Sequence, residues 1–190
     1  PPPSPSPPPP SPSPPSCTLS QVEWKDSLRV AASPGQVIKN SGDWFHYGNA
    51  YSKSTIARST QVQGVSFKCS SRCWNQCQGG LTSSSVAGVG SSYRVGARGV
   101  RGGIDYRLMC YGSSGGDVHV TGISGPSGTK WTANDVFEVR VTDNTVTYLK
   151  NDLVFHTVAQ VPDDKFPMHA DFLMASIPGG FTDVKMLSCE

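Results

Sequence analysis

Residues 137–155 alternate apolar and polar side chains in three short runs separated by turn-forming pairs. Phe137, Val139 and Val141 fall on one face of an extended chain, and the residues between them fall on the other. That two-residue period is the period of a half-buried strand, whereas a helix requires spacings of three and four. The pairs Asp143-Asn144 and Asn151-Asp152 are typical turn sequences. The segment therefore predicts a β-meander.

Similar short runs recur elsewhere in the chain, and helix-like spacing is nearly absent. They occupy residues 27–31, 36–39, 54–58, 62–67, 93–97, 104–110, 117–121, 169–174 and 184–187, with Gly, Ser, Pro and Asn between them. Many short strands at near-regular spacing favour an all-β, antiparallel sandwich, and a jelly roll is the common large form.

Residues 1–16 contain only Pro and Ser. Proline fixes φ and removes the backbone donor, so neither a helix nor a sheet can form, while polyproline II needs no internal hydrogen bonds. We expect a semi-rigid rod that reaches about 50 Å, followed by one folded domain over 17–190. The alternative is a disordered stalk that serves only as a spacer.

The net charge of +2 arises from scattered residues and predicts neither nucleic-acid binding nor membrane insertion. If the protein is secreted, its signal peptide has already been removed. Six cysteines suit three disulfides in an extracellular protein. Cys69, Cys73 and Cys77 also have a spacing at which a helical turn would align them for zinc, but closer pairs and a nearby histidine are missing. Fifteen disulfide connectivities are possible.

No catalytic residues, metal ligands or cofactor are predicted. The E-x-D-x-x-E motif of sandwich glucanases is absent, because Glu138 is followed by Arg140 where an aspartate is needed. The four histidines follow no metal or triad spacing; they are His46, His119, His156 and His169. Asp163-Asp164 could hold calcium, although two adjacent aspartates usually form a solvated turn.

Aromatic residues offer candidate contacts to a glycan or a protein partner. Trp44, Tyr47 and Tyr51 lie close together in the sequence, and sugar sites often stack a ring against an aromatic side chain. Core packing is the alternative for these residues, and it is favoured for Trp24 and Trp131.

The repeated Ser-Pro runs resemble the hydroxyproline-rich glycoproteins of plant and green-algal walls, including extensins and pherophorin-like proteins. The resemblance covers only the first sixteen residues. It implies hydroxylation of prolines and O-glycosylation within the set Pro2, Pro3, Ser4, Pro5, Ser6, Pro7, Pro8, Pro9, Pro10, Ser11, Pro12, Ser13, Pro14 and Pro15.

Residues 135–152 resemble the pattern D-x-F-x-[VI]-x-[VI]-x-x-x-x-V-x-Y-x-K-N-G of concanavalin A-like lectin/glucanase domains of the LamG-like or SPRY-like kind. Asp152 replaces the last glycine, and Asp tolerates a left-handed backbone better than most residues. In that fold the first and last strands are neighbours, which implies a Cys17–Cys189 disulfide worth about 4–5 kcal/mol on the chain-entropy account. We further expect Cys110 to pair with one of Cys69, Cys73 and Cys77, leaving the other two to bridge each other.

Two functional hypotheses follow, with no enzyme activity expected in either. In the first, the chain is a structural subunit of an extracellular fibre, cell wall or surface appendage that assembles with copies of itself through the glycosylated rod. In the second, it is a secreted lectin-like module that binds glycans and uses the rod as a spacer. An active glucanase is the least favoured reading.

Overall fold

The computed structural model describes residues 16–40, 48–73, 76–83, 104–123, 126–175 and 178–189. The fourteen expected glycosylation positions, the expected strand at 93–97, Trp44 and Tyr47 lie outside these ranges. The boundary between a rod over 1–16 and a domain over 17–190 therefore stays a prediction.

The described residues form an all-β fold with a single short 3-10 helix, η2, at Asp163–Lys165. The strands are β1 (Cys17–Gln21), β2 (Trp24–Leu28), β3 (Ala31–Ser33), β4 (Gln36–Lys39), β5 (Gly48–Ile56), β6 (Gln63–Cys69), β7 (Cys77–Ser83), β8 (Tyr106–Tyr111), β9 (Asp117–Val120), β10 (Phe137–Thr142), β11 (Thr145–Lys150), β12 (Leu153–Val158), β13 (Met168–Met174) and β14 (Gly179–Cys189). Within these ranges, no helix has the length and apolar composition needed to cross a membrane.

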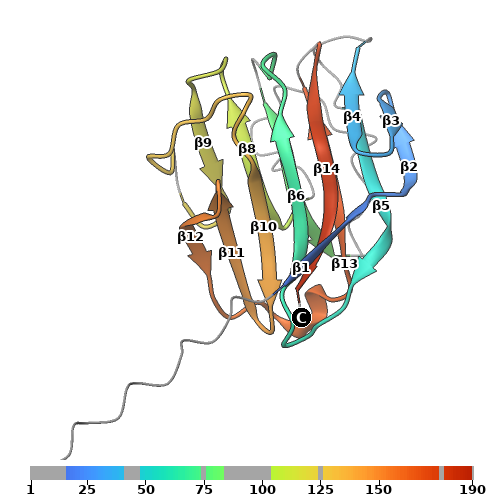
Figure 1. The fold of residues 1–190 in the computed structure, drawn as a ribbon, viewed down its shortest axis with the longest axis vertical. Helices are drawn as coiled ribbons and strands as arrows, with labels where there is room; N and C mark the ends of the chain where they lie inside the picture. Colours follow the sequence, from blue (N-terminus) through green and yellow to red (C-terminus); the bar gives the residue numbers. More distant parts are fainter. Residues whose placement is uncertain are drawn as a thin grey trace, which may run out of the picture.

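The strands form two antiparallel sheets that pack face to face (Figure 1). The larger sheet has the order β12-β11-β10-β6-β14-β4-β3, with β1 added beside β14, and the smaller has the order β2-β5-β13-β7-β8-β9. Neighbours in these orders are often distant in sequence, as when β14 inserts between β6 and β4. This arrangement confirms the antiparallel sandwich of the concanavalin A-like type.

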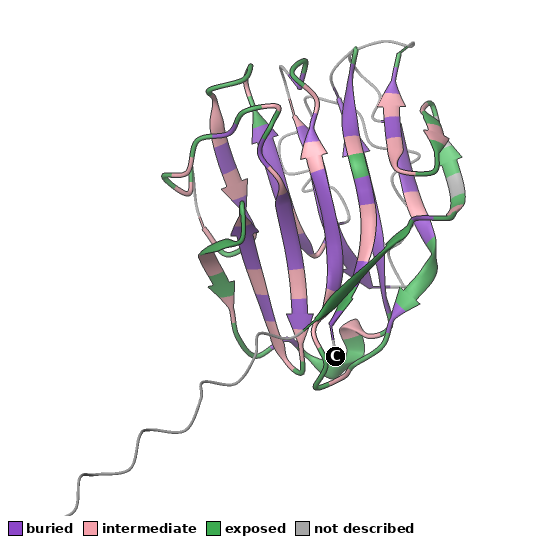
Figure 2. Ribbon diagram, viewed as in Figure 1, coloured by how far each residue is buried: buried purple, intermediate pink, exposed green. Residues whose placement is uncertain are grey.

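The core lies between the inner faces of the two sheets. Phe67 from the larger sheet packs edge-on against Phe172 from the smaller sheet, with ring centroids 5.3 Å apart, and against Phe181 at 5.2 Å. All three side chains are fully buried. Figure 2 shows the central strands largely buried, whereas β1 is exposed along its whole length. Such burial is the main stabilising term for a sandwich.

The predicted meander is β10, β11 and β12. Phe137, Val139 and Val141 are buried, as the alternation predicted. Asn151 and Asp152 have φ values of 50° and 65°, the left-handed conformation that a two-residue hairpin turn requires. Aspartate therefore occupies the position where the pattern has glycine, and the hairpin still forms.

Three strand predictions are wrong in their bounds, and one of them, the run at 184–187, is only part of β14, which spans Gly179–Cys189. The run at 27–31 is divided between β2 and β3, because Arg29 adopts a left-handed φ of 57° and turns the chain. The run at 54–58 belongs to the end of β5, which starts earlier, at Gly48. The strands at Cys17–Gln21 and Cys77–Ser83 were not predicted, because their small polar residues carry little apolar periodicity.

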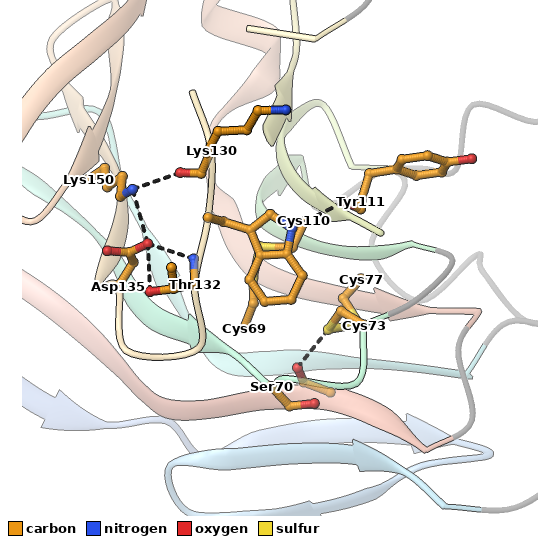
Figure 3. Close-up of a disulfide and its surroundings, with 12 residues drawn as sticks. Cys69, Ser70, Cys73, Cys77, Cys110, Tyr111, Lys130, Thr132, Asp135 and Lys150 are labelled. Atoms are coloured by element: carbon orange, nitrogen blue, oxygen red, sulfur yellow. Dashed lines mark hydrogen bonds and ion pairs between the residues drawn. A yellow bond between two sulfur atoms is a disulfide. The ribbon is translucent and has the colours of Figure 1, made fainter. Parts of the chain in front are cut away.

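All six cysteines form disulfides: Cys17–Cys189, Cys69–Cys110 and Cys73–Cys77. The first joins paired positions of β1 and β14, and the second links the two sheets across the core. The pairing agrees with the expected one and leaves no thiol for zinc. Figure 3 shows the Cys73–Cys77 bridge next to Ser70, whose carbonyl accepts a hydrogen bond from the Cys73 amide at 3.2 Å.

Candidate functional site

The outer face of the six-stranded sheet carries polar side chains that are nevertheless buried. Along β13, Ala170 and Phe172 point into the core, so Asp171 between them points away from it. Along β7, Cys77 is a core residue and a Cβ at Gly79 would contact Phe172, so Gln78 also points away. Asp171 and Gln78 are each only 4% exposed.

Two acceptor atoms on this face have no hydrogen-bond donor. Within the described part of the chain, Gln78 Oε1 and Asp171 Oδ1 are buried without a partner. Asp171 pairs with Gly80 in the β13–β7 register and Leu173 pairs with Gln78, so the two acceptors are diagonal neighbours on adjacent strands. A buried acceptor without a donor costs about 1–3 kcal/mol. A donor that reached either atom would remove this cost.

Burial changes the acidity of Asp171. Loss of water around the carboxylate raises the pKa of Asp171 to about 7, and the negative charge of Asp105 adds to the rise. The hydrogen bond from the Phe172 amide opposes it without cancelling it. Asp171 thus changes its charge near neutral pH, where a change in protonation also changes the hydrogen bonds it can make.

Gly80 separates Asp171 from Arg107 in the sheet register, since Gly80 pairs with Asp171 on one side and with Arg107 of β8 on the other. A Cβ at Gly80 would lie 2.0 Å from the Tyr106 carbonyl oxygen, so only glycine fits there. No side chain therefore stands between the Asp171 and Arg107 positions on this row of the sheet.

Aromatic side chains lie on either side of the two acceptors. Tyr51 of β5 pairs directly with Asp171, is partly exposed, and contacts the His169 ring edge-on at a centroid distance of 5.6 Å. Lys25 Nζ lies 5.8 Å from the Tyr51 ring. Towards the other edge, Tyr111 is 44% exposed and its ring lies 5.6 Å from that of His119.

At one end of the same face, Asp105 is fully paired. Its carboxylate accepts hydrogen bonds from the Ser83 amide at 2.8 Å and from Lys165 Nζ at 2.7 Å. Burial alone would raise the pKa of Asp105, but these two donors outweigh it and hold the pKa below its ordinary value. This carboxylate is held in place by its own neighbours and does not require a ligand.

Several sequence-based interpretations can be compared with the structure. Trp131 is fully buried and donates its Nε1–H to the Tyr111 carbonyl, and Trp24 packs edge-on against Phe172, so both have packing roles. Glu138 pairs with Arg140 at 2.5 Å. Asp163 lies in η2 and pairs with Arg58. Tyr51 does lie on the candidate face, and its role as a contact residue stays a prediction.

Sequence reasoning missed Asp171 and Gln78. The signal in the sequence was a charged residue inside the otherwise strand-like run Met168–Met174. Within the described ranges, no group of three or more His, Cys, Asp or Glu side chains is arranged to hold a metal ion.

No protein-family model matches the sequence, and no curated protein matches it. Among solved structures, the chain is similar to the carbohydrate recognition domain of Emp46p in its potassium-bound form, with a TM-score of 0.52 and 11% identity over 90% of this chain and 87% of that one. It is also similar to the SPRY domain of human HERC1, with a TM-score of 0.51 and 12% identity over 89% and 97% of the two chains.

A sialidase is similar as well, with a TM-score of 0.51 and 13% identity, and the match covers 83% of this chain but only 16% of that one. Identities this low show a shared fold and do not transfer a binding site or an activity. What the comparisons establish is that this chain has the concanavalin A-like sandwich fold.

Proposed function

We propose that the chain is a secreted carbohydrate-binding module whose ligand binds on the outer face of the six-stranded sheet. The observation that carries the proposal is the pair of buried acceptors, Gln78 Oε1 and Asp171 Oδ1, without donors. Sugar hydroxyl groups are donors, and a nearby partly exposed aromatic ring such as Tyr51 suits the apolar face of a pyranose. The fold shared with a protein described as a carbohydrate recognition domain supports this reading.

The chemistry of the face favours a neutral, hydroxyl-rich ligand over a charged one. Asp171 would resist an anionic sugar once ionised, and Arg107 lies only one glycine away, so neither sign of charge is strongly favoured. Three disulfides are typical of proteins from oxidising compartments, which is where such ligands are displayed.

A glycan array probed with the full chain and with matched variants tests the proposal. Asp171→Leu removes both acceptor oxygens at similar volume and should weaken binding at least tenfold. Asp164→Asn, an exposed aspartate in η2, serves as the control and should bind as the wild type does. The proposal fails if no glycan binds the wild type, or if Asp171→Leu binds as well as the control.

We propose as a second candidate that the chain is a structural subunit of an extracellular fibre or wall, joined through an O-glycosylated Pro/Ser segment. The specific observation in favour is that the Cys17–Cys189 bridge fixes the residue that follows this segment to the last strand of the fold. Any pull on the segment is then transmitted to β14 at the centre of the larger sheet.

Two measurements test this candidate. Mass spectrometry of the N-terminal peptide from native material should find pentose or hexose on hydroxylated prolines, and an unmodified peptide would contradict the resemblance to wall glycoproteins. Electron microscopy of native material and of a chain lacking residues 1–15 should show fibres only for the former. Fibres formed equally by the shortened chain would rule out assembly through this segment.

A further inference from the structure

A groove of about 190 Å³ opens between β1, β14 and the end of β5, on the side of the domain where the Pro/Ser segment joins it. Five hydroxyl side chains line it: Thr18, Ser20, Ser54, Thr55 and Ser188. In Figure 1, β1 runs obliquely across the front of the molecule towards β5. The groove is distinct from the face that carries Asp171, because its walls come from the opposite sheet and from the margin of β5.

The lining combines hydroxyl groups with an apolar part. Ile56 and Leu187 are nearly fully buried, and Met186 is partly buried. The volume is below the roughly 300–1,000 Å³ usual for small-molecule pockets. A groove of this size suits a narrow chain laid along it, with a few side chains or rings seated on the apolar part.

Proline-rich backbone has complementary chemistry. Proline has no N–H group, so a run of prolines offers carbonyl acceptors and apolar ring faces and almost no donors. Serine and threonine hydroxyl groups can donate to those carbonyls. Eleven of residues 1–15 are proline and the other four are serine. Thr18 already donates to the Ser188 carbonyl, so Ser20, Ser54, Thr55 and Ser188 are the groove residues that can supply the donors this segment lacks.

The exposed strand β1 adds a second set of donors. Among the described strands it pairs only with β14, and all five of its residues are exposed. Its other edge is not paired with any described strand, and extended peptides commonly bind along such an edge.

We propose that this groove binds the Pro/Ser segment of a second copy of the chain. The segment of the same copy joins β1 at Cys17, and β1 then runs along the groove through Thr18 and Ser20. To enter its own groove the segment would have to reverse direction at once, which a stiff proline-rich chain disfavours. A segment from a neighbouring copy enters without reversal.

The length of the segment is sufficient for this exchange. Fifteen residues in polyproline II reach about 46 Å. A domain of the 174 residues after position 16 has a radius of gyration of about 16 Å and hence a diameter of about 40 Å. One segment can therefore span its own domain and reach the groove of the next. The inference rests on the second proposed function, assembly into a fibre, and is independent of glycan binding.

Sedimentation velocity of the full chain over a wide concentration range tests the inference. The wild type should form species larger than a dimer, because each copy offers one segment and one groove. Ser20→Arg and Ser54→Arg place long side chains in the groove from exposed strand positions and should weaken association at least tenfold. Thr157→Arg, at an exposed threonine of β12 outside the groove, is the matched control and should associate as the wild type does.

A second measurement uses a labelled, unmodified peptide of sequence PPPSPSPPPPSPSPPS added to each full-length chain. It should bind the wild type and Thr157→Arg, and bind the two groove variants at least tenfold more weakly. If the groove variants associate and bind the peptide as the wild type does, the groove is the wrong site although assembly stands. If the peptide binds in the groove but the wild type stays monomeric, the site is right and the fibre function is wrong. If neither occurs, both are overturned.

Discussion

Asp135 and Asp171 are both nearly buried carboxylates in the same sandwich, at 8% and 4% exposure, yet their surroundings are opposite. Asp135 accepts hydrogen bonds from the Thr132 amide at 2.6 Å and from Asn151 Nδ2 at 2.8 Å, and it pairs with Lys150 at 3.0 Å. Figure 3 shows its carboxylate facing Thr132 and Lys150. Asp171 has one carboxylate oxygen with no partner among the described residues.

The pKa values follow this difference. At Asp135 burial raises the pKa, but the donors from Asn151, Lys150 and Thr132 outweigh it and lower the net value. At Asp171 burial dominates and the pKa rises to about 7. The comparison shows that Asp135 and Asn151, which belong to the pattern that resembles concanavalin A-like domains, hydrogen-bond to each other and hold the meander together. The unsatisfied carboxylate is the better candidate for contact with a ligand.

The largest expected effect is that of Asp171→Asn on stability as a function of pH. Because burial raises the pKa above the unfolded value of 3.8, the neutral form stabilises the fold below about pH 4 and that contribution is lost as pH rises through 7. Asparagine has no such loss. The variant should match the wild type near pH 4 and exceed it by up to about 4 kcal/mol at pH 8, measured by urea unfolding.

The control for that measurement is Asp164→Asn, which changes an exposed aspartate. Its stability should stay within about 0.5 kcal/mol of the wild type at both pH values. If the free energy of unfolding of Asp171→Asn changes with pH in parallel with that of the wild type, the Asp171 carboxylate is not shielded from water.

Asp135→Ala should lower the stability of the fold, whereas Asp171→Asn is expected to raise it. Removing the carboxylate leaves Lys150 and Asn151 without their buried partner, and we expect a loss of about 3 kcal/mol at pH 7. Thermal or urea unfolding measures it. If the loss is under about 1 kcal/mol, the Asp135 cluster does not hold the meander to the preceding loop, and the contrast with Asp171 disappears.

Gln78→Met tests the second unsatisfied acceptor. Methionine has a similar length and carries no strong acceptor, so the variant should be about 1 kcal/mol more stable than the wild type, while glycan binding should fall. A loss of stability instead would mean that the Gln78 amide contributes more through packing than its unpaired oxygen costs.

The smallest effect is expected for Asp152→Gly. At a φ of 65°, glycine adopts the turn without the steric cost that any Cβ carries, and we expect a gain of about 0.5–1 kcal/mol. The matched change Asn151→Gly at φ 50° should not give this gain, because Asn151 Oδ1 also accepts the Val136 amide at 2.9 Å. Equal gains at both positions would show that the side-chain bond of Asn151 contributes nothing.

Much of the fold could be predicted from local pattern. The alternation at 137–141 identified the buried face of β10, and the Asn151-Asp152 pair identified its turn, because strand period and turn geometry depend on neighbouring residues only. The prediction of one strand over 27–31 was wrong because nothing in the local sequence indicates that Arg29 adopts a left-handed φ. The strand at Cys77–Ser83 was missed because the requirement for Gly79 and Gly80 comes from Phe172 and β8, which are distant in the sequence.

The sequence by itself therefore determined an antiparallel β-fold, the meander, the even set of cysteines and a proline-rich segment that cannot form a ladder. Tertiary structure alone decided that Asp171 and Gln78, 93 positions apart in the sequence, become diagonal neighbours without donors, and that a groove opens beside β1 and β14. The physical reason is that burial and hydrogen-bond satisfaction depend on which strands become adjacent. That adjacency is set by long-range pairing, which no local pattern encodes.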